Sequence, residues 1–476
     1  MKNKIFSLIL TGLLISLICG LIPSSASATQ AFIPPDKIKY PGLEFRIQEA
    51  ERVLLDNGMV LFYLPDHELP LVSISALVRT GSMYDPVGKE GVADLTAYMM
   101  RTGGTAKLNS TDIDQRLDFL AASPSIAMSL DSASISFSFF KDDLDTCFDL
   151  LSQMLMQPAF EKDKLQLALS LKNEELRRIA DNPQKLAFRE FNRLLYPDDL
   201  RGRYATPASL QNIYRDDLIT FHREYFFPAN MMLAISGDIS KDEVVNKIRQ
   251  YFGNWKNVRQ AFDIAPPPKQ AGRRVFFIRK QLAQSTVVSG ELTLSKNNPD
   301  FYAFSVLDFI IGSGGFSSRI FSAVRNNEGL AYSAGSFYRA RTNYGVFGTY
   351  AFTKTASTFQ SLRLMNSILQ DVANGSISQT ELDWAKNSIL NAFIFSFEQP
   401  SQIALQQMTI AYEKLPADYL SSYRKRIEAV TRDDLKRVAA RYLNEQKRLT
   451  LILGDTDQFG QLPDNLEKPV FITPQQ

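Results

Sequence analysis

The chain has 476 residues, of which 45% are hydrophobic and 22% are charged, a composition typical of soluble globular protein. Its 53 Lys and Arg residues nearly balance its 51 Asp and Glu residues, so charge alone gives no general attraction to nucleic acid or to anionic lipid. The length predicts two or more domains.

Residues 1–28 have the features of a signal peptide. Two lysines precede an apolar run over residues 5–22, and small residues ending at Ala28 form a cleavage site. We therefore expect an exported protein, periplasmic or extracellular, with no other membrane segment. A retained membrane anchor and lipidation of Cys19 are the alternatives. After cleavage, Cys147 would be the only cysteine, which excludes an intrachain disulfide.

The rest of the chain mixes strand and helix patterns after an extended lead-in over residues 29–44. The dipeptide Asn57-Gly58 between two apolar runs predicts a β-hairpin. Residues 71–78 form an apolar run, and residues 133–140 alternate with period two, so both are predicted strands. Helices are predicted over residues 91–100, 110–121, 141–156, 162–180 and 240–252, with Ser110 or Thr111 as the N-cap of the second helix.

A repeated unit divides the chain into two halves. The residues Arg-Asp-Asp-Leu at 215–218 recur at 432–435, and in both places a Tyr follows at 10 positions and a Gly-Asp pair at 22. Identical spacing indicates a duplicated domain. The proline-rich residues 261–273 form the predicted linker between domains over residues 45–260 and 274–476. We predict an α+β fold of two homologous domains, each an antiparallel-rich sheet packed with helices.

The helix at residues 91–100 carries Asp94, Ala97 and Tyr98 at the spacing i, i+3, i+4, which places them on one face. Its surroundings resemble the zinc-binding segment of the pitrilysin, insulinase and mitochondrial processing peptidase family, with the pattern G-x-A-H-x-x-E-H-M. The resemblance implies that the two zinc-binding histidines fall on Asp94 and Tyr98, and the catalytic glutamate on Ala97. It places the third ligand on Glu175 or Glu174, with Glu175 favoured. The residues that match the frame of this pattern are Gly81, Ser82, Asp85, Gly91, Ala93, Met99, Gly104 and Thr105.

The replacements predict a degenerate site that keeps the fold. A phenol such as that of Tyr98 keeps its proton near neutral pH and is a poor zinc ligand. Ala97 cannot accept a proton, so a nonstandard metal site at Asp94 and Glu175 would lack a catalytic base. Of the only two histidines, His67 is interpreted as a surface-loop residue and His222 as a structural one. We expect no metal or other cofactor in this chain.

A glycine-rich segment at residues 312–315 precedes Arg325 and Tyr332. It lacks the Gly-Lys-Ser/Thr ending of a phosphate-binding loop. It resembles the C-terminal segment of the same family, in which an arginine and a tyrosine seven residues apart reach toward the substrate at the zinc site. The resemblance implies that Arg325 binds peptide carbonyls and that Tyr332 donates to the oxyanion. The alternative is a structural ion pair for Arg325 and simple packing for Tyr332.

The whole pattern resembles the subunit of heterodimeric family members that lacks the zinc motif, in which two such domains form half of a clamshell. This implies a chain that is inactive alone, binds peptide, and completes the active site of a homologous, zinc-bearing partner. The alternative is a catalytically inactive pseudopeptidase that acts as a peptide-binding or scaffold homodimer. We expect no nucleic-acid partner.

Overall fold

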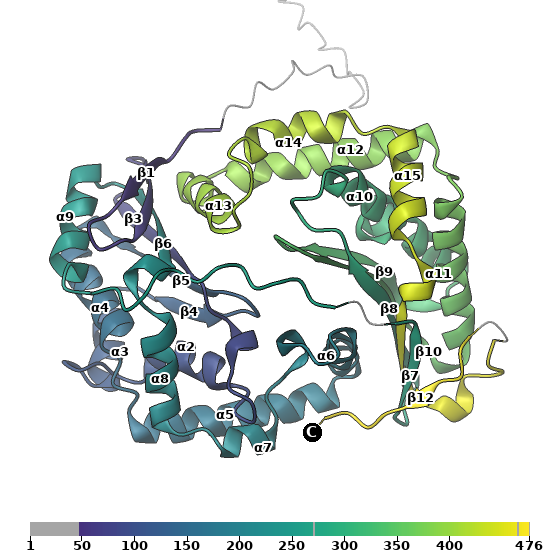
Figure 1. The fold of residues 1–476 in the computed structure, drawn as a ribbon, viewed down its shortest axis with the longest axis horizontal. Helices are drawn as coiled ribbons and strands as arrows, with labels where there is room; N and C mark the ends of the chain where they lie inside the picture. The colour runs from purple at the N-terminus through teal and green to yellow at the C-terminus, as the bar shows by residue number, and fades with distance from the viewer. Residues whose placement is uncertain (1–46, 270–271, 464–465, 476) are drawn as a thin grey trace, which may run out of the picture. The chain divides into compact units, whose positions relative to one another are not determined.

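The computed structural model describes residues 47–269, 272–463 and 466–475. Residues 47–476 fall into one compact unit, shown in Figure 1. The predicted signal peptide, residues 1–28, and the lead-in, residues 29–44, lie outside the described residues. Within the described residues, no helix is both long and apolar enough to span a membrane.

The first half of the chain builds one six-stranded sheet in the order β1-β2-β6-β3-β5-β4. The β2–β6 pair is parallel, and the other neighbouring pairs are antiparallel. The predicted hairpin is confirmed as β1 and β2, and the predicted strands at 71–78 and 133–140 as β3 and β5. The strands are β1 (Glu51–Leu54), β2 (Val60–Pro65), β3 (Leu71–Val78), β4 (Ser125–Met128), β5 (Ala133–Phe140) and β6 (Met231–Gly237).

The second half forms a sheet with the order β12-β7-β11-β8-β10-β9, in which the last five strands repeat the topology of the first sheet. The edge strand differs, because β12 pairs in parallel with β7 whereas β1 pairs antiparallel with β2. Its parallel β7–β11 pair corresponds to β2–β6, and β8, β10 and β9 follow with the antiparallel pairing of β3, β5 and β4. The predicted α+β fold of two homologous halves is therefore confirmed. The strands are β7 (Arg274–Arg279), β8 (Gln284–Thr293), β9 (Ala331–Ala340), β10 (Gly345–Lys354), β11 (Leu449–Gly454) and β12 (Val470–Phe471).

The two repeated sequence units occupy equivalent places. Each begins a helix, α8 or α15, that leads to the third strand of its sheet, β6 or β11. The helices of the first half are α2 (Val92–Thr102), α3 (Ser110–Phe119), α4 (Leu144–Met156), α5 (Lys162–Asp181), α6 (Pro183–Leu195), α7 (Pro207–Gln211), α8 (Arg215–Tyr225) and α9 (Lys241–Phe252). Those of the second are α10 (Phe301–Asp308), α11 (Thr358–Ala373), α12 (Gln379–Ile394), α13 (Pro400–Tyr412), α14 (Tyr419–Glu428) and α15 (Arg432–Tyr442).

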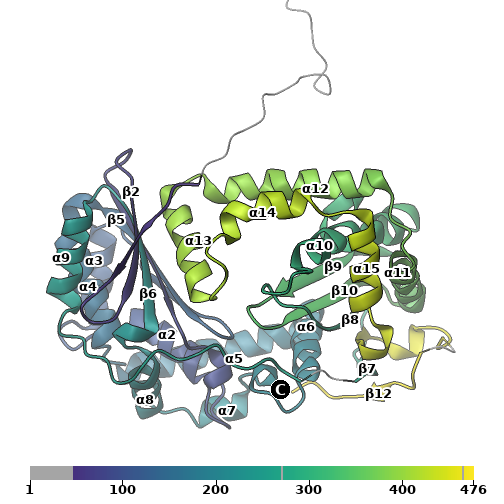
Figure 2. The same ribbon diagram turned by 45° about the horizontal axis from the view of Figure 1, so that its top comes forward.

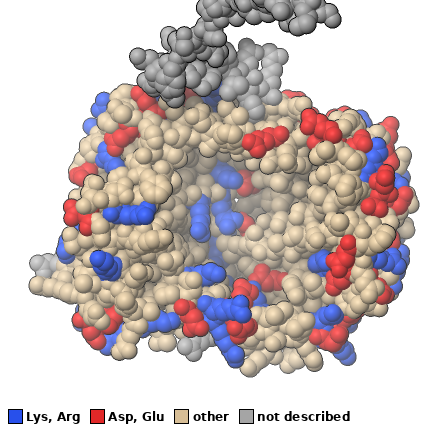
Figure 3. All heavy atoms as spheres, turned by 180° about the vertical axis from the view of Figure 1, so that it is seen from behind, with Lys and Arg blue, Asp and Glu red and all other residues tan. Residues whose placement is uncertain are grey.

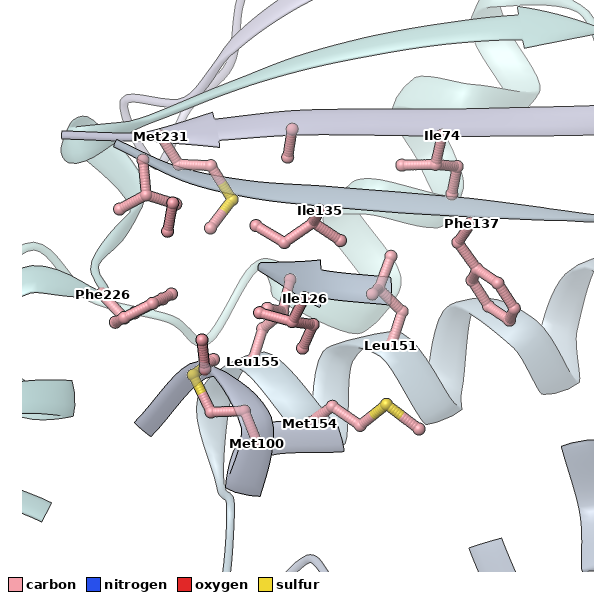
Figure 4. Packing of buried hydrophobic residues seen from close by; sticks show 14 of the residues in the cluster. Ile74, Met100, Ile126, Ile135, Phe137, Leu151, Met154, Leu155, Phe226 and Met231 are labelled. Carbon is pink, nitrogen blue, oxygen red and sulfur yellow. The ribbon is translucent and has the colours of Figure 1, made fainter. Parts of the chain in front are cut away.

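The main core of the first half lies between its sheet and helices α2 and α4. Figure 4 shows how side chains of β3, β5, α2 and α4 meet, with Ile74 and Phe137 from the sheet and Met100 and Leu151 from the helices. The inward side chains of β3 alternate with partly exposed ones, as a sheet with one face on a core requires. A similar core fills the second half.

A third core joins the two halves, and the sequence reasoning did not predict it. Helix α6 packs on β8 and β11, so Phe191 and Leu195 lie against Val288 and Leu451. Helix α13 of the second half packs on β2 and β6 of the first sheet. Figures 1 and 2 both show α6 beside the second sheet and α13 beside the first. Each half therefore contributes one helix to the sheet of the other.

Two local predictions need correction. The N-cap of α3 is Asn109, whose side chain accepts a hydrogen bond from the Asp112 amide, and not Ser110 or Thr111. The helix predicted over residues 162–180 is followed at once by α6, which was not predicted; Asn182 caps α6 by accepting from the Lys185 amide at 2.9 Å. Proline at the next position suits the first turn of a helix.

Candidate functional site

Helix α2 begins where a buried carboxylate caps it. Asp85, 4% exposed, accepts hydrogen bonds of 2.7 Å from the amides of Gly91 and Ala93. Gly91 has a φ of +115°, in the region that favours glycine. Burial raises the pKa of Asp85 to about 7, although the two amide donors oppose that rise. These retained positions of the motif therefore serve the fold of the segment.

An ammonium group lies between two positions of the degenerate motif. Lys172 of α5 donates to Asp94 Oδ2 at 2.9 Å and pairs with Glu175 Oε2 at 3.0 Å. Burial by itself lowers the pKa of Lys172, but Asp94 and Glu175 outweigh this effect, so the pKa is raised. Glu174 instead pairs with Arg178, so Glu175 is the glutamate that shares a partner with Asp94.

Ala97 and Tyr98 lie in different surroundings. Ala97 is 1% exposed and belongs to the main core, whereas Tyr98 is 43% exposed. The predicted common face of Asp94, Ala97 and Tyr98 is therefore only partly accessible, with Ala97 on its buried side. A carboxylate at position 97 would have to enter an apolar core.

These residues do not fit a zinc ion. Zinc is ligated by imidazoles, thiolates and carboxylates, but both carboxylates here are already paired with Lys172, and position 98 offers a phenol. Across the described part of the chain, no three His, Cys, Asp or Glu side chains are grouped so that they could hold a metal ion. A metal at Asp94 and Glu175 would have to displace the Lys172 ammonium.

The two histidines have structural contacts. His222 is buried, and its Nε2 lies 2.8 Å from the Leu155 carbonyl oxygen. Burial lowers the pKa of His222 to about 4, so the ring is neutral at neutral pH. His67 lies in an exposed connection with its Nδ1 2.6 Å from Asp238 Oδ1.

Arg325 lies in a cluster of aromatic rings. Its guanidinium carbon is 4.8 Å from the ring centroid of Phe321, 5.4 Å from that of Phe316 and 5.7 Å from that of Tyr332. Within the described chain, these guanidinium contacts are aromatic rather than ionic. The arginine with a structural ion pair is its neighbour Arg319, which binds Glu381 at 2.6 and 2.9 Å.

The glycine-rich segment before Arg325 permits close packing. A side-chain carbon at Gly312 would lie 2.2 Å from the Ser336 amide nitrogen of β9, and one at Gly314 would lie 2.5 Å from Trp384. One π-helical stretch, Phe309–Ser313, overlaps the start of the segment, and a second, Phe321–Asn327, contains Arg325. Such stretches are often found at functional sites. Tyr332, the second residue of β9, is 76% exposed.

Within this chain the two groups of predicted site residues are separate. A cavity of about 340 Å³ beside α2 is lined by Asp94 and by Phe337 and Arg339 near the end of β9. Tyr332 lies seven residues before Arg339 on the same strand, which is about 23 Å along an extended chain. Arg325 and Tyr332 are therefore not brought to the position of the degenerate motif.

Sequence reasoning missed Lys172 and the arginines of this cavity. The spacing from Lys172 to Glu175 is a local sign of an ion pair, but its contact with Asp94 spans 78 positions. Arg201, Arg339 and Arg341 come from distant segments and meet only in the folded chain.

Comparison with known proteins agrees with this fold. The model of the insulinase family, peptidase family M16, matches residues 63–203, and that of the peptidase M16 inactive domain matches residues 212–389. The two-domain fold and the altered helix define a peptidase-like protein. The chain belongs to peptidase family M16.

Relatives of similar length include uncharacterized zinc proteases. One from Mycobacterium tuberculosis is 25% identical over 430 residues, which cover 88% of this chain and 96% of the relative. One from Rickettsia felis is 24% identical over 302 residues, which cover 63% of this chain and 72% of the relative. The solved structure of a peptidase M16 inactive domain from Pseudomonas fluorescens has a TM-score of 0.80 at 23% identity and covers 87% of this chain and 100% of its own.

Proposed function

We propose that this chain is the non-metal-binding subunit of an exported M16 peptidase. It binds peptide and supplies Arg325 and Tyr332 to the active site of a homologous subunit that carries zinc. Cleavage near Ala28 would release it into the periplasm or the extracellular space.

The observation that carries this proposal is the contrast between the two groups of site residues. Lys172 pairs with both Asp94 and Glu175, so one group is engaged within the chain. Arg325 is held by aromatic rings, and Tyr332 is 76% exposed, so the other group remains available to a second molecule. A cation over an aromatic face is held by only about 0.5–1 kcal/mol at exposed sites, which a peptide carbonyl can replace.

The chemistry of the pair suits proteolysis. The Arg325 guanidinium offers several fixed N–H donors to peptide carbonyls. The Tyr332 hydroxyl can donate to the oxyanion that forms when water attacks the scissile carbonyl, an interaction typically worth about 2.7–4 kcal/mol in the transition state. Zinc and its activated water would come from the partner, because Ala97 provides no base here.

The test is reconstitution with a homologue from the same cell that has an intact H-x-x-E-H motif. We expect peptide cleavage by the mixture to exceed clearly the sum of the separate activities, together with a stable heterodimer in size-exclusion chromatography with light scattering. A homologue that cleaves equally well without this chain would contradict the proposal. A homodimer of this chain that does not exchange with the homologue would instead support the scaffold alternative.

A further inference from the structure

Two neighbouring cavities share a wall of arginines. One of about 420 Å³ is bounded by the end of β3, helix α13 and the turn between β9 and β10, and the other of about 340 Å³ lies beside α2. Arg201, Arg339 and Arg341 line both cavities. Figure 3 shows Lys and Arg atoms gathered in the hollow near the centre of the face seen from behind. Each volume lies in the range of known ligand sites.

The larger cavity has an excess of positive charge. Its lining contains the cations Arg79, Arg201, Lys296, Arg339 and Arg341 and the carboxylates Asp131, Asp263 and Glu413. Asp263 is also paired at 2.6 Å with Lys414, which is not part of the lining. Because the whole chain is nearly neutral, this excess is a local property of the cavity.

Three of the five cations have acidic partners. Arg341 binds Asp131 at 2.5 Å, Lys296 binds Glu413 at 2.6 Å, and Arg201 binds Asp199 at 2.9 Å. These pairs hold the wall in place and leave little net charge of their own.

Arg79 and Arg339 are different. Arg79 stacks on the Tyr412 ring at 4.3 Å and donates to the Tyr412 carbonyl oxygen, and Arg339 lies 5.4 Å from the centroid of Phe337. In the described part of the chain, neither guanidinium forms an ion pair with a carboxylate. Both therefore keep charge and donors for a ligand.

We propose that these cavities select peptides by negative charge, with Arg79 and Arg339 binding carboxylates of the peptide. This deepens the proposed peptide-binding function, on which it rests, by naming acidic peptides as its substrate class. A guanidinium forms short, often bidentate hydrogen bonds with a carboxylate. Partial enclosure strengthens such a contact relative to open solvent, and it disfavours a basic peptide by repulsion. The carboxylate comes from Asp or Glu side chains or from the peptide C-terminus.

The test measures peptide binding by the isolated chain, using fluorescence anisotropy at low and physiological salt. The probes are a labelled Glu-rich peptide, the same peptide with Gln in place of each Glu, and each with a free or amidated C-terminus. We expect the Glu peptide to bind at least about tenfold more tightly than the Gln peptide, the loss expected from one charged hydrogen bond. If amidation alone removes binding, the C-terminal carboxylate is the group that is bound.

Variants at Arg339 make the test specific, because this exposed side chain contributes little to packing. Arg339→Gln should weaken binding of the Glu peptide about tenfold, Arg339→Lys less, and Arg339→Glu should remove the preference for acidic peptides. Arg79→Gln provides a second test with a thermal melt as its folding control. Arg424→Gln, which changes an exposed arginine paired with Glu428 on α14, should have no effect.

Equal binding of Glu and Gln peptides with no loss on amidation of either, or unchanged binding by Arg339→Gln, would refute the inference. Displacement of the peptide by an equal concentration of inorganic phosphate would show a site for free anions and would refute it too. The results of these binding measurements are independent of the reconstitution test of the proposed function. A mixture that cleaves peptides without any charge preference would leave the proposed function standing, and charge-selective binding without reconstituted cleavage would leave only the inference.

Discussion

Restoring the histidines of the zinc motif should by itself restore only weakened zinc binding, because Lys172 remains. In Asp94→His/Tyr98→His, the imidazoles and Glu175 supply a three-ligand set. The Lys172 ammonium, however, still lies 3.0 Å from Glu175 Oε2 and must give up this carboxylate when zinc binds. Ala97 is left unchanged, because a glutamate there would bury a carboxylate in the core.

The size of the effect follows from this contact. A hydrogen bond to a charged group is worth about 1.5–3 kcal/mol, so competition for Glu175 alone should weaken zinc binding about tenfold to a hundredfold. Repulsion adds to this, since a doubly charged ion about 4 Å from an ammonium costs about 8 kcal/mol at an effective dielectric constant of 20. The flexible lysine can avoid much of this second cost by moving away.

Zinc affinity is measured by competition with a chromophoric chelator. We expect Asp94→His/Tyr98→His/Lys172→Gln to bind zinc at least tenfold more tightly than the double variant, and Lys172→Arg in the same background to bind no better than it. Thermal melts control for folding. Affinities within threefold of each other with and without Lys172 would show that the lysine does not occupy the site of the metal.

Three further predictions concern other parts of the chain. Burial raises the pKa of Asp85 to about 7 in the folded protein. The contribution of Asp85 to stability is therefore greatest below about pH 4 and is lost as the pH rises through 7. Asp85→Asn should remove this pH dependence in denaturant melts between pH 4 and 8. Phe191→Ala should lower the unfolding free energy by about 3–5 kcal/mol, because it leaves a cavity in the third core. Phe119→Ala, at a 90% exposed position, should change it by less than about 0.5 kcal/mol. A small effect at Phe191 would refute the importance of the third core. Arg325→Ala should raise KM of the mixed complex with little change in kcat, because the arginine holds the peptide in ground and transition states alike; a fall in kcat alone would contradict this role.

Local sequence patterns predicted β1, β2, β3 and β5 of the first sheet. The period-two alternation of β5 and the Asn57-Gly58 turn are local signals, and the structure confirms both elements. The duplication of the domain could also be predicted, because the residues Arg-Asp-Asp-Leu recur at 215–218 and 432–435 with the same spacing to the Tyr and Gly-Asp that follow. The matching strand orders of the two sheets are its structural counterpart.

Non-local contacts could not be predicted in this way. Helix α6, which Asn182 caps directly after α5, was not predicted, and its apolar face packs on strands from the other half. The motif positions Asp94, Ala97 and Tyr98 could be aligned, but the burial of Ala97 depends on the core beneath α2. The Lys172 bridge and the arginine wall likewise depend on segments that meet only after folding.

Turnover by the mixed complex with Tyr332→Phe tests the central claim most directly. The substitution removes one hydroxyl from a side chain that is 76% exposed, so stability should not change. If the hydroxyl stabilises the oxyanion at the partner's zinc site, kcat should fall about 10²–10³-fold while peptide binding stays nearly constant. Tyr214→Phe, at another exposed tyrosine, is the matched control and should leave kcat unchanged. Full turnover with Tyr332→Phe in a complex that forms normally would contradict the account.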